Sequence, residues 1–125
     1  MDRYLCFVLM IVAFPFAMPQ STERGPCKCG VFPVGTSKSI IERSFQLNVT
    51  CDNEGLEQCV ALCVALAKTA QDRMPQMICE AIEEHVENLQ VAVFAETCDS
   101  LSWTFTGLKS EEPFLCCHDR KSISC

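Results

Sequence analysis

Basic residues are scarce in this 125-residue chain, which has ten Lys and Arg against sixteen Asp and Glu and a formal net charge of −6. A protein that binds nucleic acid or an anionic membrane needs a positively charged surface facing the phosphates. We therefore expect no nucleic-acid partner. Histidine is scarcer still, with two in the chain, and the Cys-x-x-Cys pattern of thiol redox proteins is absent.

Few residues are suited to catalysis. A Ser-His-Asp arrangement would have to use His85 or His118, and nothing around Ser44, Ser100 or Ser122 resembles the strained turn that exposes a nucleophile. The closely spaced cysteines could ligate zinc in a reducing cell. The opening apolar segment, described next, predicts export to an oxidising compartment, which favours disulfides instead. We predict a non-enzymatic protein with no metal and no cofactor.

Long apolar runs are also missing after the first twenty residues. The longest, from Cys59 to Ala67, is about half of what a bilayer requires, so we expect no membrane span. The opening segment has a short polar start and an apolar run from Leu5 to Phe16, which is typical of a secretory signal peptide. We expect cleavage after residue 17, or as late as residue 21, then a flexible leader over 18–26 and a single disulfide-rich domain over 27–125.

Cysteine, by contrast, is abundant. Cys6 lies in the signal peptide, and an even number remains in a small domain that is expected to be secreted, which predicts five disulfides in an extracellular protein. We expect neither Cys59 and Cys63 nor Cys116 and Cys117 to be joined to each other, because such close spacings give poor bridge geometry. The sequence leaves the pairing itself open. The ten cysteines are Cys27, Cys29, Cys51, Cys59, Cys63, Cys79, Cys98, Cys116, Cys117 and Cys125.

Apolar periodicity predicts two main helices and two short strands. Helical spacing runs over 54–70, after the possible capping residues Asp52 and Asn53, and again over 75–94, where Pro75 suits a first turn. Alternating apolar and polar residues predict strands near 43–50 and 101–106. The expected fold class is α+β, as a small, helix-dominated, disulfide-rich domain.

The predicted first strand carries a modification signal. Asn48-Val49-Thr50 is an N-glycosylation sequon, and strand alternation places Asn48 on the polar face. We expect a glycan on Asn48.

The cysteine spacing resembles that of the insect follicle cell protein 3C family of small secreted proteins. The matching pieces are the segment CKCGVF from Cys27, the QC-x3-C of residues 58–63, the long intervals from Cys63 to Cys79 and on to Cys98, and the closing CC-x7-C. The resemblance implies secretion and an eggshell or other extracellular-layer setting with protein partners. It implies no particular chemistry.

A different function is the alternative. Six of the cysteines, in the order Cys29-x29-Cys59-x3-Cys63-x34-Cys98-x17-Cys116-x8-Cys125, come close to the pattern of insect odorant-binding proteins, which carry small apolar ligands. A carrier needs an apolar cavity of roughly 300 Å3 or more. We expect instead a structural or interaction protein with a filled core and no such enclosed cavity. In that core we expect five side chains to pack together: Leu62, Leu66, Ile82, Val86 and Trp103.

Overall fold

Strands, and not helices, dominate the part of the chain that the structure describes, which in this computed structural model is residues 23–125. Strands hold 43% of these residues and helices 24%, so the prediction of a helix-dominated fold is wrong. The expected signal peptide, its cleavage site and Cys6 lie outside the described residues. The expected flexible leader over 18–26 is also cut short, because the first strand already begins at Arg24.

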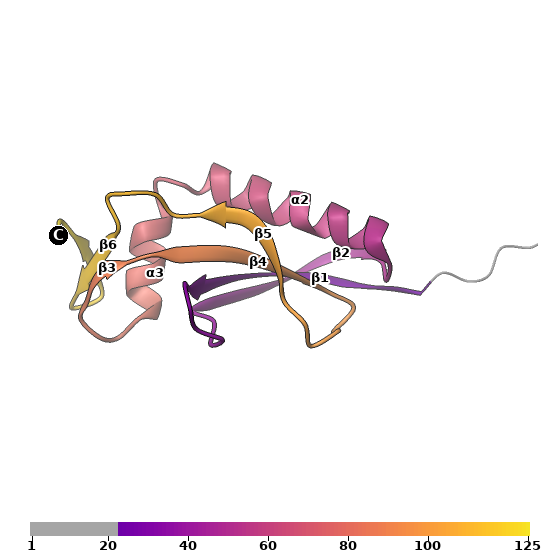
Figure 1. The fold of residues 1–125 in the computed structure, drawn as a ribbon, viewed down its shortest axis with the longest axis horizontal. Helices are drawn as coiled ribbons and strands as arrows, with labels where there is room; N and C mark the ends of the chain where they lie inside the picture. The colour runs from indigo at the N-terminus through magenta and orange to yellow at the C-terminus, as the bar shows by residue number, and fades with distance from the viewer. Residues whose placement is uncertain (1–22) are drawn as a thin grey trace, which may run out of the picture.

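The larger sheet has four antiparallel strands in the order β2-β1-β4-β5. These are β2 (Ile41–Thr50), β1 (Arg24–Pro33), β4 (Val91–Thr97) and β5 (Thr104–Lys109). Helix α2 (Asn53–Thr69) runs along one face of this sheet (Figure 1). Side chains alternate between the two faces of a strand, so Cys27 of β1 and Val93 and Ala95 of β4 point toward α2. All three are buried in one core cluster, together with Cys59 and Cys63 of α2.

Helix α2 confirms the helix predicted over 54–70. It begins where Asp52 caps it, with Asp52 Oδ1 accepting a hydrogen bond from the Gly55 backbone N–H at 2.9 Å. Such a cap satisfies one of the free N–H groups at a helix start. Cys59 and Cys63, four residues apart, are buried on the sheet side, as the periodicity predicts.

A smaller sheet lies at the other end of the molecule, beside the second helix (Figure 1). Its strands are β3 (Val86–Leu89), β6 (Leu115–His118) and β7 (Lys121–Ile123), in the order β3-β6-β7. The helix is α3 (Met74–Ala81). Ile78 of α3 packs with Val31 of β1 and Val91 of β4 in a second buried cluster, and Leu89 and Leu115 of the smaller sheet pack against it. Helix α3 therefore lies between the two sheets and contacts both.

The helix predicted over 75–94 is wrong beyond its first half. Helix α3 ends at Ala81, Ile82 already has an extended backbone, and the chain then forms β3 and β4 with only Gln90 between them. Val86 pairs with Cys117 of β6, and Val93 pairs with Val31 of β1. The apolar residues of this stretch also fit a strand that is buried on both faces, and such strands lack the alternation that distinguishes them from helices.

The two predicted strands are present with shifted bounds. The strand near 43–50 lies within β2, but the pairing with β1 slips between Pro26 and Cys27, so that Pro26 faces Asn48 and Cys27 faces Phe45. The slip leaves Leu47, which was expected on the apolar face, 46% exposed. The strand near 101–106 begins only at Thr104, and Leu101 lies in the preceding loop.

Candidate functional site

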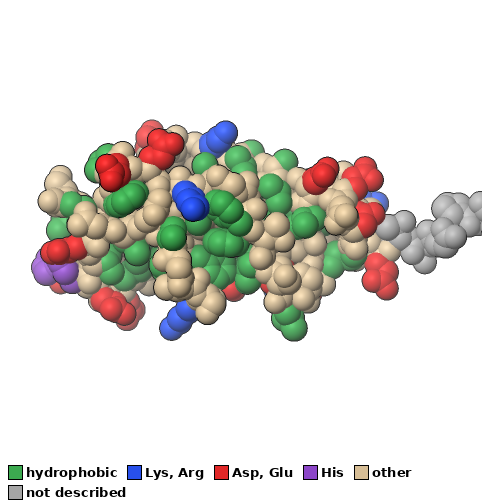
Figure 2. All heavy atoms as spheres, viewed as in Figure 1, with side chains coloured by type: hydrophobic (Ala, Val, Ile, Leu, Met, Phe, Trp, Pro, Cys, Tyr) green, Lys and Arg blue, Asp and Glu red, His purple; other side chains and the backbone are tan. Residues whose placement is uncertain are grey.

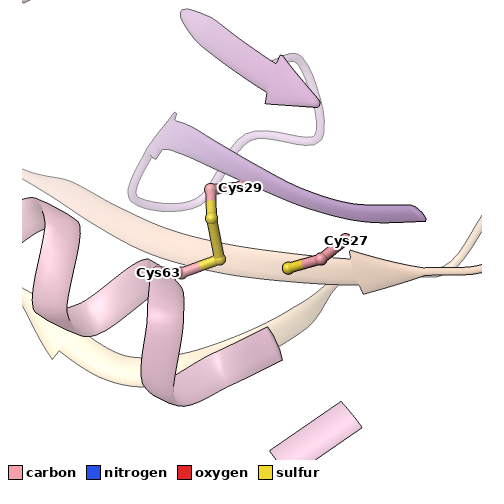
Figure 3. A group of neighbouring side chains, drawn as sticks. All are labelled: Cys27, Cys29 and Cys63. Carbon is pink, nitrogen blue, oxygen red and sulfur yellow. A yellow bond between two sulfur atoms is a disulfide. The ribbon is translucent and has the colours of Figure 1, made fainter. Parts of the chain in front are cut away.

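Two parallel disulfides fasten α2 to the sheet. Cys27 and Cys29, which lie on the same face of β1, bond to Cys59 and Cys63, which lie one turn apart on α2. Figure 3 shows Cys27, Cys29 and Cys63 between the strand and the helix. Their sulfur atoms lie close enough together to resemble a thiolate metal site, but each belongs to a disulfide and is not free to bind a metal.

The other three disulfides hold the ends of the fold. Cys51, directly after β2, bonds to Cys98 after β4. Cys79 of α3 bonds to Cys117, and Cys116 bonds to Cys125 at the end of the chain. Adjacent residues of a strand point to opposite faces, which is how the Cys116-Cys117 pair reaches two different partners.

The expected framework of five disulfides is therefore confirmed, and neither close pair is joined to itself. The sequence itself contains a signal for part of this pairing. Two cysteines spaced by two on a strand share a face, and so do two cysteines spaced by four on a helix. Cys27 and Cys29 could have been matched to Cys59 and Cys63 on that basis once a strand had been assigned to residues 24–33.

A groove opens between α2, α3, the segment from β5 to β6 and the end of the chain, with a volume of about 940 Å3. Its apolar wall takes in residues of both core clusters. Figure 2 shows hydrophobic side chains gathered over the middle of one face of the molecule, with acidic side chains toward its ends. The residues that line the groove include Ala67, Met74, Pro75, Ile78, Val91, Val93, Leu108, Pro113, Phe114, Leu115, Cys116 and Ile123.

Apolar and charged residues occupy different parts of this groove. Ile78, Val91 and Val93 are buried, so they form its inner wall. Lys68 of α2 and Glu111, after β5, also line the groove but are exposed. Gln71, Lys109, Ser110, Glu112, Ser122 and Ser124 line it as well, so the groove combines an apolar inner wall with a markedly polar rim. Small-molecule sites have volumes of about 300–1,000 Å3 and an apolar lining with a few polar groups.

The core does not form as predicted. The groove is open to solvent, so it does not contradict the expectation that the core holds no enclosed apolar cavity. The five residues expected to pack together are, however, divided. Leu66 is 38% exposed, Ile82 packs with the cluster around Ile78, and Trp103 packs against Phe32, with ring centroids 5.2 Å apart.

Trp103 belongs to an aromatic cluster on the sheet face opposite α2. Phe32 contacts both Trp103 and Phe94, and Phe94 contacts Phe105 at a centroid distance of 5.5 Å. A Cβ added to Gly30 would lie 3.1 Å from the Trp103 ring, so the glycine lets the indole approach the strand. We interpret this cluster as a satellite core, because Phe32 is 4% exposed.

A charged pair borders the aromatic cluster. Glu96 is buried, and Lys28 Nζ lies 3.9 Å from its carboxylate and 2.9 Å from that of Asp99. The pKa of Lys28 is raised above its usual value, first by the hydrogen bond to Asp99 and by the charge of that residue. The positive charge of Lys28 compensates the buried carboxylate of Glu96, and neither residue lines the groove. We therefore assign this pair a structural role.

Asn48 lies on β2, at the edge of the larger sheet, and its side chain is exposed. The two histidines do not line the groove; they lie together at the far end of the smaller sheet. None of the helices in residues 23–125 is long and apolar enough to cross a membrane.

Comparisons with protein-family models, with curated proteins and with solved structures found no match to this chain.

Proposed function

We propose that this chain is a secreted, non-enzymatic binding protein that takes a small apolar ligand into the groove between α2, α3 and the C-terminal segment. The observation that carries the proposal is the groove itself, with its volume of about 940 Å3 and its apolar inner wall. Moving apolar surface from water into such a wall contributes roughly 25 cal/mol per Å2. Burial against this wall therefore favours an apolar ligand and needs no charged contact.

Two further features support a binding role outside the cell. Five disulfides in so small a domain are typical of oxidising compartments. The cysteines that line the groove, Cys116 and Cys125, are joined to each other and offer no thiol nucleophile. The inner wall has the composition of a site that holds a ligand by apolar contact.

The test is a fluorescence titration of the untagged, disulfide-bonded protein with N-phenyl-1-naphthylamine, followed by displacement with a fatty acid or a terpenoid. We expect one saturable site with a micromolar or lower Kd. Ala67 lines the groove on α2, whereas Ala65 is exposed and does not. Ala67→Trp should fill the groove and weaken probe binding at least tenfold, and Ala65→Trp should leave it unchanged.

A second variant guards against a folding defect in Ala67→Trp. Ile123 lines the groove at its exposed side and is 45% exposed, so Ile123→Lys should keep the fold and still weaken binding by placing a charge against the apolar ligand. Weak probe binding that does not saturate, or equal effects of Ala65→Trp and Ala67→Trp, would contradict the proposal.

A structural or interaction role in an extracellular layer, such as an eggshell, is the second candidate. It rests on the resemblance of the cysteine spacing to the follicle cell protein 3C family, and the disulfide framework is consistent with a protein that must persist outside the cell. In that case the apolar probe finds no saturable site, and the secreted protein is recovered with the insoluble layer and not with the surrounding fluid.

We also propose that Asn48 carries an N-linked glycan. Its side chain is exposed, and β2 is an edge strand, where a bulky glycan would hinder pairing with a second sheet. Protein secreted from eukaryotic cells should lose mass on treatment with a glycosidase, and Asn48→Gln should abolish the change. An unchanged mass in the parent protein would contradict this assignment.

A further inference from the structure

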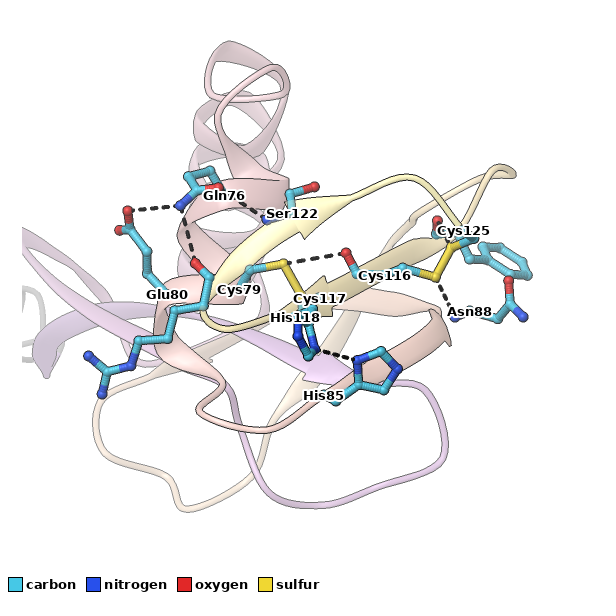
Figure 4. Close-up of a disulfide and its surroundings, with 12 residues drawn as sticks. Gln76, Cys79, Glu80, His85, Asn88, Cys116, Cys117, His118, Ser122 and Cys125 are labelled. Atoms are coloured by element: carbon cyan, nitrogen blue, oxygen red, sulfur yellow. Dashed lines mark hydrogen bonds between the residues drawn. A yellow bond between two sulfur atoms is a disulfide. The ribbon is translucent and has the colours of Figure 1, made fainter.

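The fold brings the only two histidines of the sequence into contact, although they lie 33 positions apart. His85 directly precedes β3, and His118 ends β6. These strands pair through Val86 and Cys117, the chain neighbours of the two histidines. The two Nδ1 atoms lie 3.1 Å apart, and a dashed line in Figure 4 marks this contact between the two rings, whose planes are 76° apart.

The outer nitrogen of each ring faces a carboxylate. His85 Nε2 lies 3.0 Å from Glu87 Oε1, and His118 Nε2 lies 3.4 Å from Asp119 Oδ2. An ionised carboxylate can only accept hydrogen bonds, so the hydrogen bond to Glu87 favours a proton on His85 Nε2, and the nearby charge of Asp119 favours one on His118 Nε2. In a neutral imidazole the other nitrogen then carries a lone pair. With the proton on Nε2 of both rings, the two Nδ1 atoms cannot hydrogen-bond to each other, and their lone pairs are free to converge on one cation beside the 3.1 Å contact.

We propose that His85 Nδ1 and His118 Nδ1 bind a divalent transition-metal ion, Zn2+ or Cu2+, with water completing the coordination. Imidazole nitrogen is a preferred ligand for both ions. Two nitrogens at Zn–N distances of 2.0–2.1 Å in a tetrahedral site lie about 3.3 Å apart, close to the 3.1 Å in the structure. A carboxylate that accepts from the outer N–H, as Glu87 does from His85, is the usual outer partner of a ligating histidine.

The surroundings favour a cation and hold the rings in place. Four acidic residues supply negative charge at this end of the molecule: Glu83, Glu84, Glu87 and Asp119. Two basic residues oppose them: Arg120, which bonds to Glu83, and Lys121, which pairs with His118 across the hairpin. Cys117, next to His118, is bonded to Cys79 of α3, so β6 is fixed before any ion binds. Both histidines are about half exposed, which gives an ion free access.

The test is calorimetric titration of the untagged, disulfide-bonded protein with ZnCl2 and with CuCl2 at pH 7.5, where free imidazole is mostly neutral. We expect one ion per chain. His85→Gln and His118→Gln should each weaken binding at least tenfold, and Glu87→Gln should weaken it about tenfold by removing the outer partner. Glu84→Gln removes an equal charge from an exposed neighbour that, among the described residues, has no hydrogen bond or ion pair with either ring, and we expect a change of less than threefold.

A spectroscopic measurement provides an independent readout. Correlation of the ring 1H and 15N signals should place the proton on Nε2 of both histidines, and Zn2+ should shift both Nδ1 signals together. The proposal is overturned by a Kd weaker than about 1 mM, by binding that survives both histidine substitutions, or by a Zn2+-induced shift confined to one ring. Equal losses in Glu84→Gln and Glu87→Gln would also overturn it, because they would indicate only a general attraction of cations to the acidic end.

Discussion

At the residue scale, Gly55 has the least room for a side chain among the described glycines. It lies in the first turn of α2 and is buried against the end of β2. A Cβ built at this position would lie 1.6 Å from the backbone oxygen of Thr50. A backbone oxygen cannot move away as a flexible side chain can, so the close approach of α2 to β2 requires glycine here.

We therefore expect Gly55→Ala to destabilise the protein by about 1–3 kcal/mol, the usual cost of overpacking. Helix propensity alone predicts the opposite sign, since alanine is favoured over glycine by about 1 kcal/mol in a helix. The measurement is denaturant unfolding with the disulfides intact. Glu57→Ala, at an exposed position of α2, is the control and should change stability by less than about 0.5 kcal/mol. A Gly55→Ala protein more stable than the parent would show that the helix start is free to shift.

At the element scale, the start of α2 depends on a charged cap. Asp52 Oδ1 accepts hydrogen bonds from the Thr50 hydroxyl at 2.6 Å and from the Gly55 N–H at 2.9 Å. These two bonds, the Thr50 bond first, lower the pKa of Asp52 below its usual value. A carboxylate at a helix N-terminus also interacts favourably with the helix dipole. The folded state therefore favours the ionised form of Asp52.

This preference predicts how stability depends on pH. Because the pKa is lower in the folded state, the stabilisation is present above the unfolded-state pKa of about 3.9 and is lost as the pH falls through the lower folded-state value. Asp52→Asn keeps an acceptor but removes the charge. We expect it to be less stable than the parent at pH 7, with the difference shrinking toward zero below pH 4. Unfolding midpoints between pH 7 and pH 2 are the measurement.

The exposed turn residue Asp72 provides the control for this experiment. Asp72→Asn removes one negative charge from the chain without altering the cap, so its unfolding midpoints should follow those of the parent across the same pH range. A stability difference between the parent and Asp52→Asn that is independent of pH would contradict the role assigned to the ionised cap.

At the scale of the whole molecule, the disulfides divide into two groups. Cys27–Cys59 and Cys29–Cys63 join α2 to the large sheet through residues that are distant in sequence. Cys116–Cys125 spans only nine residues and holds the C-terminal segment beside the groove. Since a bridge that closes a longer loop removes more entropy from the unfolded chain, the first group should contribute more to stability.

We expect removal of both bridges of the first group, in Cys27→Ala/Cys29→Ala/Cys59→Ala/Cys63→Ala, to lose at least about 1 kcal/mol more than Cys116→Ala/Cys125→Ala, from the difference in loop length alone. Cys27 and Cys59 are fully buried, which adds the cost of a cavity. The measurement is denaturant unfolding of each variant with the remaining bridges intact, supported by disulfide mapping. A larger loss on removing Cys116–Cys125 would show that the terminal segment, and not the helix-to-sheet contact, limits stability.

Local signals in the sequence were sufficient for the elements that form from neighbouring residues. The stripe of α2 and its cap at Asp52 lie within one continuous segment, so the helix over 54–70 is correctly predicted. The strand near 43–50 and the number of disulfides were predicted for the same reason, because alternation and an even cysteine count need no knowledge of distant partners.

Tertiary contacts decided the rest. Residues 86–97 carry apolar side chains that suit a helix or a buried strand, and their pairing with β1 and β6 selects the strand. The groove and the His85–His118 contact are each built from segments far apart in the chain, so no local pattern encodes them. Sequence periodicity determined which faces are apolar, and only the packing of α2 and α3 against two sheets decided which of those faces meet and which are left to line a groove.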